Sequence, residues 1–147
     1  MATDIPQLMK MSQAELDDLF RNSPPGPIPD GEAEGTAIIA PGTALEETAA
    51  KFIHFFAWQG KVFDAAKGEL RNRISLFGVH AIIAKVYQDK SWFDQKDCIA
   101  LDYSKTSLLA HWIRDEIRQV GPGVYLGIVF WGRKKLIDFA LKFPNHN

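Results

Sequence analysis

The sequence predicts a mainly β protein: an antiparallel up-and-down β-barrel of about eight to nine strands, with an N-terminal helix and one helix between the first two strands. From Gly60 onward the apolar residues recur with the period of two that is typical of strands. Short turns such as Gly121-Pro122-Gly123 and Gly132-Arg133 separate these segments, which favours pairing between consecutive antiparallel strands. An open sheet curled around the second helix is the competing geometry.

The expected strands follow from this alternation. The first covers residues 32–39, before Pro41-Gly42, and the later ones cover residues 61–65, 69–76, 79–88, 97–102, 108–120, 124–131 and 136–143. The segment 124–131 is apolar on both faces. We therefore expect a helix to cover its outer face.

Two capping boxes mark the expected helices. Ser12 with Glu15 begins the first helix, and the prolines from Pro24 end it. Thr43 with Glu46 begins the second, which is expected at residues 43–58. Residues 1–29 are thus an N-terminal helix and Pro-rich connector, 30–143 a single barrel domain and 144–147 a tail. The N-terminal helix fits a lid over the barrel mouth and an exterior brace equally well.

Composition excludes several classes of protein. The 147 residues suit one domain, with 46% hydrophobic and 24% charged residues, which is typical of a globular chain. Lys plus Arg is 17 and Asp plus Glu is 18, for a net charge of −1, so a nucleic-acid partner is not expected. The sequence has neither the pattern of a signal peptide nor that of a membrane span, and we predict a cytoplasmic protein with no membrane partner.

Motifs for common chemistry are missing from the sequence. It has no nucleotide-binding loop, dinucleotide fingerprint or nucleophile elbow. Cys98 lies in an apolar segment and is expected to be a buried, inert thiol. The four histidines lack metal-ligand spacing, and we predict no metal and no cofactor; they are His54, His80, His111 and His146. The carboxylate pairs Asp94/Asp97 and Asp102/Asp115 are candidates for acid–base chemistry that the sequence does not separate from solvated turn residues.

Two expected strands each place arginines on one face. One carries Arg73, and the other carries Arg114 on the same face as Trp112, with His111 and Asp115 on the opposite face. If the arginines point inward, they need a carboxylate partner or an acidic ligand; if they point outward, they are solvated charges. We select Arg114 as the inward anchor.

The stretch from Phe56 to Asp64 resembles the W-x-G-K-x-F segment of the small bacterial GXWXG/DUF4334-type proteins. Gly31 and Gly35 keep the two glycines of the name-giving motif, and Ala33 stands where that family has tryptophan. The similarity covers roughly residues 31–143, as that of a divergent relative. It implies a calycin-like, lipocalin-like small-molecule-binding barrel of uncharacterised physiological role.

These observations lead to one functional hypothesis and two rivals. We expect the barrel to bind a small hydrophobic, acidic molecule without catalysing a reaction. The expected ligand-binding residues are Arg114, Arg73, Tyr125, Tyr103, His111 and Trp112. The first rival is a small isomerase or lyase that uses His111, Asp115 or Tyr125 as general acid or base. The second is a barrel filled by its own side chains that acts through its surface or as a homodimer.

Overall fold

The computed structural model describes residues 3–38, 61–72, 82–103 and 113–144. Its helices are α1 (Ile5–Leu8) and α2 (Gln13–Asn22). Its strands are β1 (Gly31–Ile38), β2 (Lys61–Asp64), β3 (Glu69–Asn72), β4 (Ile82–Lys90), β5 (Asp97–Asp102), β6 (Ile113–Gly121), β7 (Val124–Trp131) and β8 (Lys134–Lys142). The helix expected at residues 43–58 lies outside the described residues.

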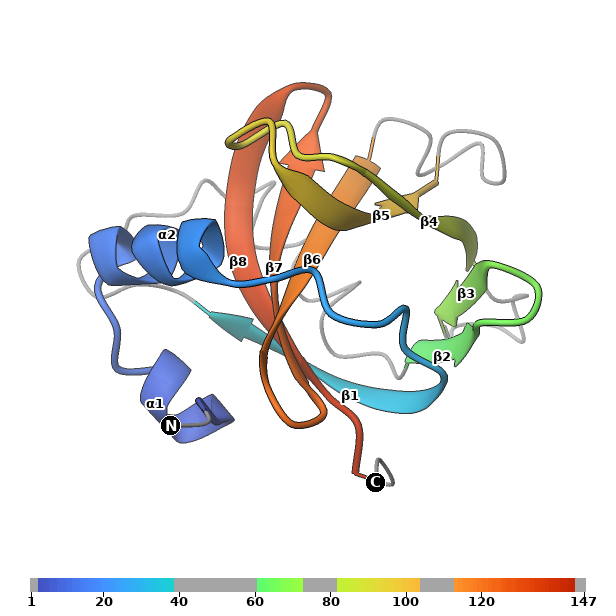
Figure 1. Cartoon of the computed structure of the whole chain (residues 1–147), viewed down its shortest axis with the longest axis horizontal. Coiled ribbons are helices and arrows are strands. Elements are labelled where there is room, and N and C mark those ends of the chain that lie inside the picture. The colour runs from blue at the N-terminus through green and yellow to red at the C-terminus, as the bar shows by residue number, and fades with distance from the viewer. Residues whose placement is uncertain (1–2, 39–60, 73–81, 104–112, 145–147) are drawn as a thin grey trace, which may run out of the picture.

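The strands close into a barrel (Figure 1). Each strand pairs antiparallel with the next one in the chain, and β1 also pairs with β8, where Ala37 lies opposite Phe139. The predicted mainly β fold and its up-and-down order are therefore confirmed, and the open sheet is excluded. Gly123 (φ 66°) and Gly132 (φ 60°) supply the left-handed backbone of the last two hairpin turns.

An apolar cluster lines the inner face of the barrel. It draws residues from all eight strands, because alternate residues of a strand point to the same face. Its members include Ala33, Phe63, Leu70, Val86, Leu101, Ile117, Val129 and Phe139. Ala33, at the position where the resembling family has tryptophan, belongs to this inner cluster.

The N-terminal helices lie outside the barrel (Figure 1). A second apolar cluster joins them to the outer face of the strands. Leu16 and Phe20 of α2 pack there with Leu126, Ile128 and Phe130 of β7. The strand β7 is thus buried on both faces, as its sequence predicts. The helix α2 is therefore an exterior brace. The side chain of Gln13, in the first turn of α2, donates a 2.7 Å hydrogen bond to Asp138 of β8 and fixes this turn to the barrel.

The N-terminal helical region is split, which corrects the single helix expected there. The four residues of α1 begin after Asp4, whose side chain and that of Gln7 form a capping box. The predicted capping box of Ser12 and Glu15 begins α2. Leu8 at the end of α1 is fully buried in the outer cluster, and this contact supports a helix too short to be stable alone.

Candidate functional site

The orientation of β6 decides which polar side chains enter the barrel. Residues that pair across neighbouring strands share a face, and Asp115 pairs with Val129 of the inner cluster. Arg114 pairs with Phe130 of the outer cluster. Arg114 therefore lies on the outer face, and the expectation that it points inward is wrong. The inward polar residue of this strand is its neighbour Asp115.

Lys61 joins Asp115 on the inner face. It pairs with Ala33 of the inner cluster and lies two residues before Phe63, which belongs to the same cluster. Lys61 is 3% exposed and Asp115 is 5% exposed. Among the described residues, they are the two buried charged side chains on the inner face. The other buried charged residues occupy outward-facing positions; they are Arg114, Glu116, Arg118 and Asp138.

Burial changes the protonation of both groups. It raises the pKa of Asp115 from 3.8 to about 7, against the effect of the nearby Lys61 charge, which lowers it. Burial also lowers the pKa of Lys61, and the charge of Asp115 opposes this shift. The two charges thus stabilise each other inside the barrel.

Asp115 has an unused hydrogen-bonding atom. Its Oδ1 is buried, and no group in the described part of the chain donates a hydrogen bond to it. A buried acceptor without a donor costs about 1–3 kcal/mol, and more when it is charged. Such atoms are rare in folded proteins, and a functional role or a donor from a bound water or ligand is among their explanations.

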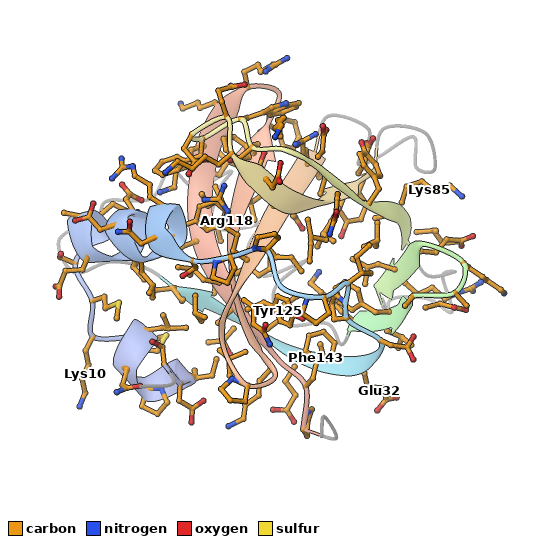
Figure 2. The ribbon with its side chains drawn as sticks, viewed as in Figure 1. Lys10, Glu32, Lys85, Arg118, Tyr125 and Phe143 are labelled. Atoms are coloured by element: carbon orange, nitrogen blue, oxygen red, sulfur yellow. The ribbon has the colours of Figure 1, made fainter. Side chains whose placement is uncertain are left out.

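Both predicted tyrosines belong to the inner cluster. Tyr103 is fully buried. The Tyr125 hydroxyl donates a 2.7 Å hydrogen bond to the Pro27 carbonyl, so it fastens the connector after α2 to the barrel (Figure 2). Burial raises the pKa of Tyr125. The ring of Phe143 packs edge-on against that of Tyr125, with their centroids 5.6 Å apart.

The remaining predicted ligand-binding residues are Arg73, His111 and Trp112, and all three lie outside the described residues. The structure therefore brings Tyr103 and Tyr125 to the inner face, and places Arg114 on the other side of the wall.

Arg114 is instead part of an ionic network on the outer face of β6. Its guanidinium donates to Asp89 at 2.9 Å, to Glu116 at 3.1 Å and to the Lys90 carbonyl at 2.9 Å. It also stacks over the Trp92 ring, 4.5 Å from the centroid. Because each of its three nitrogens already donates a hydrogen bond, Arg114 has a structural role: it holds the end of β4 and the turn after it against the barrel.

Arg118 performs the same role beside α2 (Figure 2). It forms two hydrogen bonds with Asp94, at 2.7 and 2.8 Å, and donates a third to the Phe20 carbonyl of α2 at 2.8 Å. The hydrogen bonds of Arg118 lower the pKa of Asp94. Asp94 is therefore a structural partner of Arg118.

The other chemical candidates are also accounted for. Asp102 pairs with Arg114 and accepts a 2.7 Å hydrogen bond from Tyr87, so it faces away from Asp115 and the two carboxylates do not share a site. Cys98 is fully buried, and burial raises its pKa to about 12, as expected for an inert thiol. Within the described ranges, no group of His, Cys, Asp or Glu side chains is placed to hold a metal ion.

The molecule is therefore a small, closed, antiparallel β-barrel with a charged pair on its inner wall. Comparison with solved structures supports this class: a protein from Thermomonospora curvata superimposes with a TM-score of 0.60 over 90% of this chain and 88% of that one. The two sequences are 16% identical, so the likeness concerns the fold alone. No protein-family profile matches the chain, and no curated protein is similar to it. None of the described helices is long and apolar enough to cross a bilayer.

The sequence predicts Asp115 as a candidate general acid or base on the face opposite Arg114, and the structure places it on the inner face. Ile113 and Ile117 flank it at the strand period, and two branched apolar side chains identify the core-facing side. Lys61 has a similar signal in Phe63. Lysine is almost never fully buried unless it is paired, so Lys61 alone does not suggest an inward position.

Proposed function

We propose that this protein binds a small, largely hydrophobic molecule inside its barrel. The observation that carries the proposal is Asp115 Oδ1, a buried acceptor on the inner wall to which the described residues supply no donor. A barrel of eight strands either is filled by side chains or holds one small ligand. In a filled barrel this oxygen has no hydrogen bond to offset its loss of water. A ligand with a donor group supplies that hydrogen bond.

Two further features support a ligand rather than a filled interior. The inner wall carries Ala33 and Ala84, which occupy little space. It also carries aromatic rings, Phe63, Tyr125 and Phe143, of the kind that line apolar binding sites. A few polar groups among apolar side chains are the usual composition of such a site.

The acidic character expected of the ligand rested on Arg114 and Arg73. Arg114 lies outside the barrel with its donors engaged, and Arg73 is not among the described residues. Lys61 is a cation of the inner wall, yet Asp115 accompanies it. The ligand we propose therefore keeps a hydrophobic body, and the chemistry of its polar group is inferred from Asp115.

Native mass spectrometry tests the proposal. Protein purified from its own source is weighed under native and denaturing conditions, and a bound molecule appears as a mass difference. A retained small molecule supports the binding barrel and gives its mass. A native mass equal to the denatured mass, together with no thermal shift across a panel of fatty acids, phenols and heme, contradicts it and favours the filled interior.

A proton-transfer enzyme is the second candidate, because a buried carboxyl with a pKa of about 7 suits a general base. Its test is solvent exchange. The retained molecule is incubated with the protein in D2O, and deuterium at a C–H position, absent with Asp115→Asn, supports catalysis. Unlabelled ligand recovered from the wild type contradicts catalysis by proton abstraction and leaves the binding proposal intact.

A further inference from the structure

We propose that Asp115 is the polar recognition group of the barrel and that its ligand is a neutral molecule with a hydroxyl or N–H donor on an apolar body. This inference rests on the proposed function and specifies the chemistry of the same site. It differs from the acidic ligand that the sequence suggests, and it assigns the specificity to a residue other than the arginines.

The position of Asp115 supports the donor. On β6 it lies between Ile113 and Ile117, and it pairs with Val129 of β7 and Leu101 of β5. These four neighbours belong to the inner apolar cluster. The carboxylate is thus a single acceptor in an apolar wall, where a donor from the ligand forms a stronger hydrogen bond than it does in water.

The charge balance supports a neutral ligand. Lys61 and Asp115 carry opposite charges on the described inner wall, so together they add no net charge to the interior. An anionic ligand adds a second negative charge near Asp115, and a cationic ligand adds a second positive charge near Lys61. Either leaves a buried charge without compensation, which is unfavourable in a low-dielectric interior. A neutral donor satisfies Oδ1 without this cost.

Three matched probes test the inference. 2-Naphthol has a hydroxyl donor, 2-methoxynaphthalene has the same rings without the donor, and 2-naphthoate has an anionic group. Their dissociation constants are measured by calorimetry at about pH 8, where the Asp115 carboxyl is mostly ionised. We expect 2-naphthol to bind at least about tenfold more tightly than 2-methoxynaphthalene, as a hydrogen bond to a charged acceptor provides.

Two variants assign the preference to one side chain. Asp115→Leu removes the acceptor and is expected to bind the first two probes equally. Asp115→Asn keeps a carbonyl acceptor and retains part of the preference. Asp102→Asn is the matched control, since Asp102 lies on the outer face of the adjacent strand, and it is expected to keep the full preference. If Asp115→Leu does not fold, the wild-type comparison of the probes decides alone.

The outcomes separate the two proposals. Equal wild-type affinities for 2-naphthol and 2-methoxynaphthalene overturn the role of Asp115 while leaving a binding barrel. Tightest binding of 2-naphthoate overturns the neutral class and favours an anion near Lys61. If none of the three probes binds and no molecule is retained in native mass spectrometry, the proposed function itself fails.

Discussion

Replacing Asp115 by asparagine is expected to change how the stability of the protein depends on pH. In the folded protein its pKa is about 7, against 3.8 for an ordinary aspartate. The folded state therefore binds more protons than the unfolded state between about pH 4 and 7, so the free energy of unfolding falls as the pH rises through this window. A shift of this size corresponds to about 4 kcal/mol, fully expressed above the folded pKa.

Asp115→Asn removes the titrating group and therefore the fall in the free energy of unfolding with rising pH. Relative to the wild type, the variant is expected to gain about 2.5 kcal/mol in the free energy of unfolding between about pH 5 and 8. The assay is urea denaturation of both proteins across this range, followed by circular dichroism. The free-energy difference between the variant and the wild type is compared at the two pH values, so any effect of the amide on packing that does not depend on pH cancels.

Asp18→Asn is the control for this experiment. Asp18 lies on α2, where its side chain is 71% exposed and pairs with Arg21, so its replacement is expected to change stability by less than about 1 kcal/mol at either pH. A constant difference between Asp115→Asn and the wild type from about pH 5 to 8 refutes the reasoning. It means that the carboxyl is not held in a desolvated interior.

Three further outcomes test the packing. Arg118→Ala leaves Asp94 and the Phe20 carbonyl without their buried donor, and urea denaturation is expected to show a loss of about 3–5 kcal/mol. Gly127→Ala places a Cβ 2.2 Å from the Phe139 ring and is expected to cost about 1–3 kcal/mol by the same assay, less when Phe139→Leu is added. The Cys98 thiol, whose pKa is about 12, is expected to react with a disulfide reagent in urea and not in the native protein.

Each of these predictions has a contradicting result. An Arg118→Ala variant within about 1 kcal/mol of the wild type means that the ionic network contributes little. A Gly127→Ala variant of wild-type stability means that the inner wall has room beside Phe139. Reaction of the native Cys98 thiol at the rate of the unfolded chain means that β5 opens readily.

The barrel could be predicted because its signals are local. Alternation along the strands and turn residues such as Gly123 depend on neighbours in the sequence, and β7 shows both of its buried faces in its own residues. The Ser12–Glu15 capping box is also local. The structure confirms these elements and closes the barrel through the pairing of β1 with β8, the first and last strands in the chain.

The orientation of the arginines could not be predicted, because it depends on distant partners. Arg114 and Arg118 are buried on the outer face because the end of β4 supplies Asp89 and the turn after it supplies Asp94, about 25 residues away in the chain. Such pairs leave no periodic signal on β6 itself. The pairing of Asp115 with Lys61 could not be predicted for a similar reason, since the two residues come from strands far apart in the sequence.

The most direct test of the account is to determine whether a bound probe lies inside the barrel. Intermolecular NOEs are measured between 2-naphthol and the methyl groups of the labelled protein. The account predicts NOEs to Ile117 and Val129, which face inward, and none to Leu126 and Ile128, which lie on the outer face of β7. NOEs confined to Leu126 and Ile128 place the probe under the helices and contradict binding inside the barrel.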